Sequence, residues 1–241
     1  MITKISSFIN RQMFEPTLIG VFVNPFYIAR ISLLKEIKKL GSEISGKTLD
    51  VGCGTKPYKK YFASSEYVGL EIEEQTNNQI KQADVYYDGK HFPFENAEFD
   101  SLLSNQVLEH VFNPTEFLSE INRVLKINGK LLISVPFVWD EHEQPYDYAR
   151  YSSFGLIHLL QQHGFEILKS KKSVNDFRLF AQLLNAFIYK IVRKNKIIKQ
   201  LFTFFVMSLI SLIGIFIGKM LPQNDDLFLD NIILAKKITN V

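Results

Sequence analysis

The sequence predicts an α/β protein built on a doubly wound, seven-stranded, mostly parallel sheet. Three observations predict it. Short apolar segments alternate with amphipathic helical segments, a glycine turn follows the first apolar segment, and polar side chains follow later ones. The 241 residues are 46% hydrophobic, which is enough for a core and excludes a disordered chain.

The first half of the chain shows this alternation in order. Residues 26–40 place isoleucines and leucines at helical spacing, so they predict an amphipathic helix. Residues 47–51 are an apolar strand that runs into a glycine turn, and Pro57 is suited to the first turn of a helix over 57–63. Three more strands are expected at 67–72, 84–87 and 99–104.

The second half continues the pattern. Asn113 is a plausible N-cap for a helix over 113–126, with Pro114 at its first position. A strand is expected at 130–135, a helix at 152–163 that ends at Gly164, and the last strands at 165–168 and 227–236.

Composition and charge exclude several classes of protein. Cys53 is the single cysteine, so a disulfide scaffold and a cysteine-clustered zinc or iron–sulfur site are excluded, and no metal ligands are predicted. Residues 51–170 carry ten Lys and Arg against seventeen acids, whereas residues 171–241 carry eleven against four. An acidic middle argues against nucleic acid, and the basic ends predict an anionic partner.

A hydrophobic insertion separates the last two predicted strands. Residues 176–192 form an apolar helical stripe, four basic residues follow at 193–199, and residues 201–217 carry no charge. One membrane crossing is disfavoured, because the flanking strands must join the same sheet. We therefore expect residues 177–221 to lie on an anionic membrane surface as two interfacial or shallow re-entrant helices. The alternative is a helical cap buried on the enzyme or in a homodimer interface.

Four parts of the chain follow from these observations. They are an N-terminal helical segment at 1–45, a core at 46–176, the insertion at 177–222, and the last strand with the C-terminus at 223–241. The first ten residues have no long apolar run and no cleavage site, so a secretory signal is not expected.

The glycine turn is the first candidate binding motif. Residues 50–55 (DVGCGT) follow a strand, and glycines at such a turn let a ligand approach the backbone closely. A tight turn without a ligand would use the same glycines. Pro57 occupies the third glycine position of the dinucleotide pattern G-x-G-x-x-G, which disfavours a nicotinamide cofactor.

Two more motifs lie at the ends of later strands. Glu71 ends the second strand, where an acid can bind both hydroxyls of a ribose, although a solvated acid is the alternative. Residues 104–110 (SNQVLEH) end the fourth strand, at the edge where ligands bind in such sheets. His110 next to Glu109 is either a site residue or a surface pair.

Together these motifs resemble the class I S-adenosylmethionine-dependent methyltransferases of the small-molecule type (methyltransferase type 11), which have a Rossmann-like fold. The resemblance covers about residues 47–168, and a second matching segment lies at 231–237. It is carried by the stretches TLDVGCG at 48–54, FPF at 92–94 before EFD at 98–100, VLEHV at 107–111, EINRVLK at 120–126 and Gly164-Phe165.

The resemblance implies S-adenosylmethionine as the cofactor and a role for particular residues. The turn formed by Asp50, Gly52, Cys53 and Gly54 would pass under the methionine part, with Asp50 near its amino group. Glu71 would hold the ribose hydroxyls, and Asp84 would meet the adenine amino group with Val85 beside the ring. Asn105 and Gln106 would lie along the methionine end. Many members have a third glycine where this chain has Lys56, so the backbone just after Gly54 is the point of departure.

The loop after the fifth strand is the candidate acceptor site. Residues 142–151 (HEQPYDYARY) hold an imidazole, two carboxylates, a guanidinium and three phenols. We expect His142 or Asp147 to act as general base and Arg150 to bind an anionic group, with His110 nearby. The alternative is an internal ion pair between Asp147 and Arg150 that holds the loop shut.

The sequence thus predicts a cytoplasmic, peripherally membrane-associated methyltransferase that acts on a small or lipid-linked acceptor, such as a glycan or quinone precursor. Two other functions remain as alternatives. One is a non-catalytic cofactor-binding or scaffolding protein of the same fold, and the other is a nicotinamide-dependent oxidoreductase.

Overall fold

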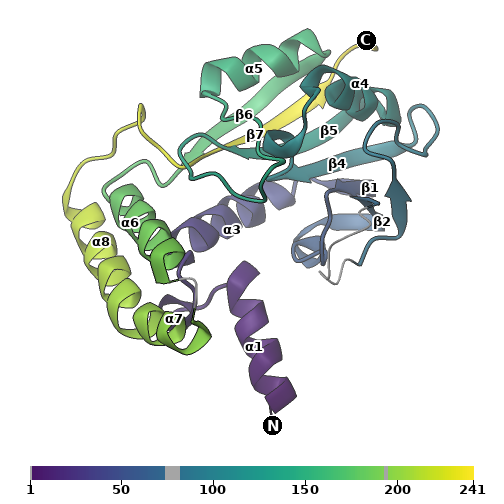
Figure 1. The fold of residues 1–241 in the computed structure, drawn as a ribbon. Helices are drawn as coiled ribbons and strands as arrows, with labels where there is room; N and C mark the ends of the chain where they lie inside the picture. The colour runs from purple at the N-terminus through teal and green to yellow at the C-terminus, as the bar shows by residue number, and fades with distance from the viewer. Residues whose placement is uncertain (1, 74–81, 193–194) are drawn as a thin grey trace. The chain divides into compact units, whose positions relative to one another are not determined.

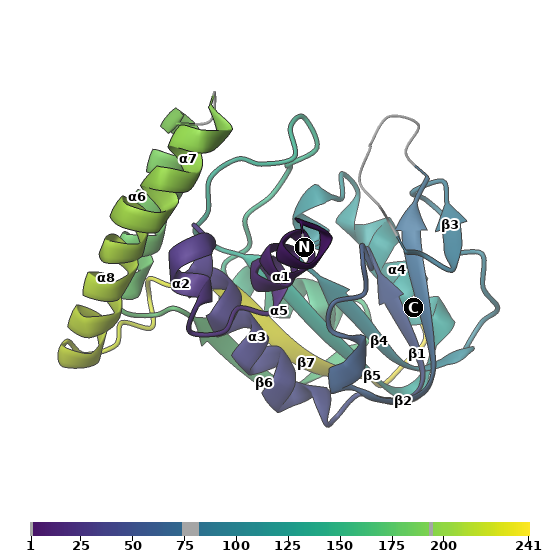
Figure 2. The same cartoon turned by 90° about the horizontal axis from the view of Figure 1, so that it is seen from below.

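The computed structural model describes residues 2–73, 82–192 and 195–241, and Figure 1 and Figure 2 show its ribbon from two directions. The strands are β1 (Ser45–Val51), β2 (Ala63–Ile72), β3 (Val85–Tyr87), β4 (Phe99–Asn105), β5 (Leu125–Pro136), β6 (Phe165–Ser173) and β7 (Asp230–Lys237). The α-helices are α1 (Ile2–Phe14), α2 (Gly20–Val23), α3 (Tyr27–Gly41), α4 (Pro114–Val124), α5 (Ser153–Gln162), α6 (Arg178–Ile191), α7 (Lys196–Phe202) and α8 (Ser208–Met220). Short 3₁₀ turns η1 (Lys59–Tyr61) and η2 (Leu108–His110) and a π-helical segment η4 (Thr203–Met207) complete the elements discussed below.

The strands form one seven-stranded sheet in the order β3-β2-β1-β4-β5-β7-β6. The pairings of β1 with β2 and β4, of β2 with β3, and of β4 with β5 are parallel. The predicted fold class, a mostly parallel sheet with a helical insertion before the last strand, is confirmed.

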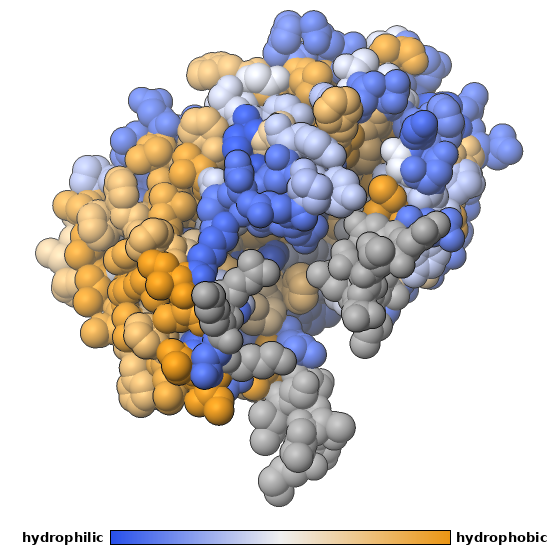
Figure 3. Space-filling view, viewed as in Figure 1, coloured by the Kyte–Doolittle hydropathy of each residue, from blue (hydrophilic) through white to orange (hydrophobic). Residues whose placement is uncertain are grey.

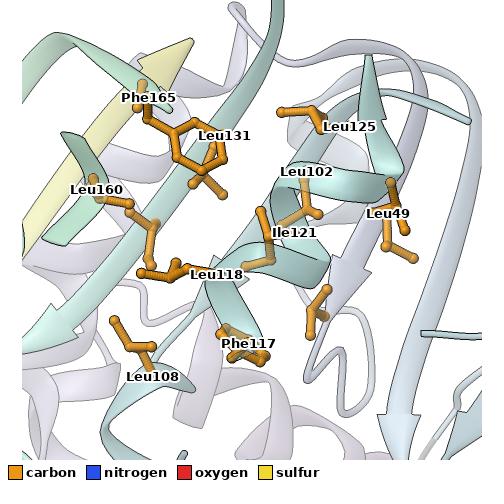
Figure 4. Close-up of a cluster of buried hydrophobic side chains, with 14 of the residues drawn as sticks. Leu49, Leu102, Leu108, Phe117, Leu118, Ile121, Leu125, Leu131, Leu160 and Phe165 are labelled. Atoms are coloured by element: carbon orange, nitrogen blue, oxygen red, sulfur yellow. The ribbon is translucent and has the colours of Figure 1, made fainter. Parts of the chain in front are cut away.

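The core of the sheet lies against two helices whose ends follow local rules. The side chain of Asn113 accepts a hydrogen bond from the backbone of Glu116 and caps α4, as predicted, and Ser152 caps α5. Helices α4 and α5 pack with β4 and β5 in one buried cluster (Figure 4), whose members include Leu102, Leu118, Ile121, Leu131, Leu160 and Phe165.

One predicted helix is wrong. Residues 57–63 form only the 3₁₀ turn η1, because β2 begins at Ala63, whose N–H already donates to the carbonyl oxygen of Ile44 at 3.1 Å. Too few residues remain between the glycine turn and β2 for a helix. The glycine turn is therefore not followed by the N-terminus of an α-helix, and its ligand-binding groups are those of the turn itself.

The chain divides into two compact units. One comprises residues 37–137, 141–171 and 231–241 and holds nearly the whole sheet; the other comprises residues 1–36, 138–140 and 172–230. The N-terminal segment and the hydrophobic insertion, which are far apart in sequence, thus belong to the same unit. In that unit α6 crosses α8 closely, since a Cβ added to Gly214 would lie 2.3 Å from the Cβ of Ala181.

Candidate active site

The carboxyl ends of three neighbouring strands meet at one edge of the sheet. Val51 at the end of β1 is in register with Leu70 of β2 on one side and with Ser104 of β4 on the other. The glycine turn, Glu71 and Asn105 each follow one of these positions directly. Three segments that are separate in sequence are therefore adjacent, as parallel pairing requires.

The glycine turn is shaped by two left-handed residues. Gly52 has φ +70° and Gly54 has φ +51°, a conformation that favours glycine. The N–H groups of Gly52 and Cys53 both donate to the carbonyl oxygen of Leu70, at 2.9 and 3.2 Å. A Cβ on Gly52 would lie 2.4 Å from Val107, whereas a Cβ on Gly54 would meet nothing within 4 Å. The turn is thus packed on one side and open beside Gly54.

Replacing Gly54 by alanine tests whether a ligand uses that open side. The new Cβ enters open space but sits on a left-handed residue, so we expect about 1 kcal/mol of lost stability and about tenfold weaker binding of S-adenosylhomocysteine. Titration calorimetry and urea unfolding measure the two effects. Gly155→Ala on α5 is the control, because its Cβ meets only Ser152 at 3.3 Å. Unchanged affinity in Gly54→Ala would place the ligand elsewhere.

Two acidic side chains flank the turn. Asp50 is buried, its Oδ2 accepts a hydrogen bond from the Tyr67 hydroxyl at 2.7 Å, and burial raises its pKa to about 7. Glu71 is 8% exposed, and its Oε2 accepts from the N–H of Gly54 at 3.0 Å. The Glu71 carboxylate is therefore directed at the glycine turn and not into bulk water, which fits a group that holds a ligand there.

The other member of the turn, Cys53, has no nucleophilic role. It is buried, and burial raises the pKa of its thiol to about 12, with nearby acids adding to the effect. A protonated buried thiol contributes packing under the turn.

Lys56 stands where many members of the resembling family have a glycine, and the structure accommodates the lysine there. It has φ +53°, so the backbone still takes the conformation that a glycine would take there. Its side chain passes over Gly69, where a Cβ would lie 2.2 Å from its Cε, and pairs with Asp84. The Asp84 Oδ2 also accepts from the N–H of Gly69 at 2.7 Å. The ion pair and Gly69 together accommodate a lysine at this position.

The end of β3 carries an acid that the sequence reasoning missed. Asp84 precedes β3, whereas Asp88 directly follows it, at the edge of the sheet where Glu71 lies near the end of β2. The Asp88 Oδ1 accepts from the N–H groups of Lys90 and His91, and these bonds lower its pKa. The signal that would have found it is position: binding residues follow the carboxyl ends of strands.

The end of β4 is fixed by β5. The N–H of Gln106, which has φ +57°, donates to the carbonyl oxygen of Ser134 at 2.9 Å. The hydroxyl of Ser134 donates to Oδ1 of Asn105 at 2.7 Å. Asn105 and Gln106 are both half-buried, so they line the same edge as the glycine turn.

The candidate acceptor loop contains the ion pair that was the alternative interpretation. Asp147 accepts from Arg150 with both oxygens, at 2.5 and 2.6 Å, and from the N–H of His142 at 2.9 Å. Its pKa is lowered to about 2: burial opposes this shift, but the bonds from Arg150 and His142 outweigh it. A carboxylate with so low a pKa is a weak base, so of the two residues His142 is the better candidate for general base.

A second group of side chains lies beside this loop. Glu109 is fully buried on η2, and its carbonyl oxygen accepts from the N–H groups of Tyr148 and Ala149 at 2.8 and 3.2 Å. His110 and His142 lie edge to face, with ring centroids 4.7 Å apart. The structure therefore brings His110, His142, Asp147 and Arg150 together, as the predicted acceptor site requires.

A hollow of about 620 Å³ lies at the opposite end of β4. It is lined by Glu98, which directly precedes β4, and by Arg123, which is bonded to Glu120 and to the carbonyl oxygens of Phe92 and Phe94. Within this lining Arg123 is paired with Glu120, and Glu98 is paired with Lys47. We therefore place the functional site at the carboxyl edge despite the size of this hollow.

The fold and the site together are typical of one class of protein, the α/β enzymes that bind a nucleoside cofactor over a glycine turn. Comparisons with known proteins support one family of such enzymes. Residues 49–133 match the family described as "Methyltransferase domain". A probable S-adenosylmethionine-dependent methyltransferase of Mycolicibacterium smegmatis is 25% identical over 167 residues, which are 64% of each chain.

Two further matches agree. An O-methyltransferase of Aspergillus nomiae is 27% identical over 167 residues, or 59% of this chain and 74% of that one. The crystal structure of a phosphoethanolamine N-methyltransferase of Haemonchus contortus with S-adenosylhomocysteine has the same fold, with TM-score 0.56 and 18% identity over 92% of this chain and 56% of that one. The first curated relatives are covered over 50% to 74% of their own length.

Residues 49–133 match a methyltransferase domain, and together with the named relatives this match supports a class I S-adenosylmethionine-dependent methyltransferase, which is what the sequence predicted. The residues of this structure fit the cofactor, because the turn is open beside Gly54 and Glu71 is directed at it. When bound, S-adenosylmethionine supplies an electrophilic methyl group on a sulfonium.

Proposed function

We propose that this enzyme methylates a small or lipid-linked acceptor at a membrane surface. The observation that carries the proposal is the orientation of α6, which buries two amide side chains while it exposes several of its large apolar side chains. Gln182 and Asn185 are fully buried, whereas Phe180, Phe187 and Ile191 are 52%, 63% and 64% exposed. This is the reverse of a helix that meets water.

The buried polar groups of α6 are bonded within the same unit. The Oε1 of Gln182 accepts from the N–H of Ala29 at 3.0 Å, and its Nε2 donates to the carbonyl oxygen of Pro25 at 3.2 Å. Asn185 donates to Ser211 at 2.8 Å and to the carbonyl oxygen of Met207 at 3.1 Å. These bonds fix the rotation of α6, so its apolar face stays outward.

The second helix of the insertion presents a matching apolar face. Residues Ile197–Met220 form one apolar helical stretch, and only 28% of its most apolar 18-residue window is buried. Its exposed residues recur at spacings of three and four, which places them along one side: Leu201, Phe205, Leu209, Leu212, Phe216 and Met220. Figure 3 shows the hydrophobic surface that α6, α7 and α8 form together. A surface of this extent is typical of a membrane or protein interaction site.

The way in which the insertion begins and ends argues against a single crossing. The N–H of Leu229 donates to the carbonyl oxygen of Ser173 at 2.9 Å, and Ser173 and Asp230 also bond through their side chains. The chain therefore leaves and returns at one point, which supports a pair of helices lying in the interface. The basic residues Arg193 and Lys194 lie between α6 and α7, outside the described residues. The positive charge of these two residues favours anionic lipid headgroups.

In the active site, the chain's own residues would position the acceptor and remove its proton. His142 is the candidate base, and Asp147 orients it through a contact of 3.2 Å between Oδ2 and Nδ1. We assign Asp50, Gly52, Cys53, Gly54, Glu71, Asn105 and Gln106 to the cofactor, as the resemblance implies. We also assign Asp88 to the adenine end of the cofactor. Asp84 and Val85, at the start of β3, would support the same end. Much of the rate of methyl transfer comes from holding the acceptor in line with the bond between the sulfonium sulfur and the methyl group.

Charge on the apolar face should abolish membrane binding. Phe187 and Phe216 are both exposed, and each would contribute about 1.5–3 kcal/mol when it is buried in the membrane. We therefore expect the double variant Phe187→Asp/Phe216→Asp to float with anionic vesicles at least about tenfold less than the natural protein. Phe154→Asp is the matched control, because this phenylalanine is 83% exposed on α5.

The same experiment separates the alternatives. Equal flotation of the natural protein and the double variant would contradict the membrane proposal. A dimer on gel filtration that the double variant converts to monomer would instead assign the apolar face to a homodimer. Methyl transfer from labelled S-adenosylmethionine into a lipid extract, compared with a water-soluble extract, tests the acceptor class.

A further inference from the structure

Three potential metal ligands converge beside the acceptor loop. One donor atom each from Glu109, His110 and His142 lies within 4.8 Å of the other two. Glu109 and His110 are on η2 after β4, and His142 is in the loop after β5. Because β4 and β5 are neighbours in the sheet, the fold brings these distant residues together. The cofactor assignment uses none of the three.

The ring nitrogens of both histidines are oriented by the surrounding protein. The Nδ1 of His110 lies 2.8 Å from the carbonyl oxygen of Tyr146, so it carries the proton and the lone pair is on Nε2, which is 3.9 Å from Oε1 of Glu109. The Nδ1 of His142 lies 3.2 Å from Oδ2 of Asp147 and 3.5 Å from Arg150, so we assign its proton toward Asp147. Metal-binding histidines are held in this way, with one N–H on a carbonyl or carboxylate oxygen.

We propose that Glu109, His110 and His142 bind one divalent transition-metal ion, with Zn²⁺ as the best fit. Two imidazoles and one carboxylate are the ligands of catalytic zinc sites that keep a position open. An ion about 2.1 Å from each donor would hold the donors roughly 3.4 Å apart, so small side-chain movements close the site. The fully buried carboxylate of Glu109 supplies charge that stabilises a cation.

A metal ion at this site would restrict the class of acceptor in the proposed function. This restriction rests on the proposed function. With an ion bound, the Nε2 lone pair of His142 is a metal ligand, so His142 does not also act as the base. The ion instead binds a hydroxyl group at its open position and lowers the pKa of that hydroxyl. The acceptor would then be an oxygen nucleophile, bound beside the loop that carries Asp147 and Arg150. Metal binding itself does not depend on the proposed function.

Metal binding by the full, tag-free chain tests the inference. After treatment with a chelator, the protein is loaded with Zn²⁺ or Co²⁺ and separated from excess ion. We expect one equivalent of metal by elemental analysis, and a visible Co²⁺ spectrum that S-adenosylhomocysteine does not abolish. His142→Gln should weaken Zn²⁺ binding at least about 100-fold, since it removes a direct ligand. His158→Gln, on an exposed position of α5, is the matched control and should retain the metal.

Each outcome decides one question. Less than about 0.2 equivalents of metal, or equal retention by His142→Gln and the natural protein, overturns the site. Glu109→Gln alters a buried group, so its unfolding temperature is measured alongside, and His142→Gln carries the conclusion where that variant does not fold. Failure of the proposed function is distinguishable: it appears as absent methyl transfer in protein that holds one equivalent of metal.

Discussion

Replacement of Asp50 by asparagine is expected to stabilise the cofactor-free protein at pH 8 by about 3–4 kcal/mol, and to change its stability little at pH 4. The carboxyl is 4% exposed, and burial, with a smaller contribution from Glu71, raises its pKa to about 7. An amide has no charge to bury and still offers an oxygen to the Tyr67 hydroxyl, which lies 2.7 Å from Oδ2 of Asp50.

The direction of the pH dependence follows from proton linkage. The folded protein keeps the Asp50 proton up to about pH 7, whereas the unfolded chain releases it near pH 4. The natural protein therefore loses stability as the pH rises from about 4 to about 7, and each pKa unit corresponds to about 1.4 kcal/mol. The asparagine variant lacks this loss, so the difference between the two proteins grows over the same range.

Urea unfolding of both proteins at pH 4 and pH 8 measures the effect. Asp226→Asn is the control, because this exposed carboxylate should change stability by less than about 0.5 kcal/mol at either pH. A constant difference between the natural protein and Asp50→Asn across the range would show that Asp50 does not titrate on folding. The variant should also bind S-adenosylhomocysteine more weakly, if Asp50 meets the amino group of the cofactor as the resemblance implies.

Replacement of Glu71 by glutamine is expected to weaken binding of S-adenosylhomocysteine about 10- to 100-fold. The charged acceptor is lost, and hydrogen bonds to charged groups contribute about 1.5–3 kcal/mol. The carboxylate also accepts from the N–H groups of Gly54 and Ile72, at 3.0 and 3.1 Å, so a neutral side chain loosens the turn as well. Calorimetric titration measures the affinity.

Glu73→Gln is the matched control for Glu71→Gln. It removes the same charge two residues later, where the side chain is exposed, and should leave the affinity within about twofold. Equal weakening by both variants would indicate a general effect of charge and would contradict ribose binding by Glu71. Parallel urea unfolding shows whether the loss of affinity exceeds the loss of stability.

The fold class and the strands could be predicted from sequence because periodicity and turn residues are local. The alternation of strands and helices is sufficient to predict a parallel sheet, and Asn113 with Pro114 marks the start of α4. The helix expected over 57–63 could not be excluded in this way. Its absence depends on the start of β2, which the pairing of Ala63 with Ile44 determines.

The sequence predicted which strand ends carry the candidate site residues, and the structure shows how those residues are held. Glu71 is predictable because strand ends in parallel sheets share one edge. The third strand ends at Tyr87, as expected, but Asp88 was missed because the acid at the adenine end was assigned to Asp84 from the resemblance and not from its position after a strand. The pairing of Lys56 with Asp84 depends on Gly69, and no local pattern connects those three positions.

By itself the sequence determined the glycine turn, the succession of strands along the chain, and the apolar character of the insertion, because each depends on neighbouring residues. The tertiary structure alone decided which face of α6 is outward and that His110 meets His142. The physical reason is that these features arise from long-range contacts. The bonds of Gln182 and Asn185 set the rotation of a helix, and the pairing of β4 with β5 joins two loops.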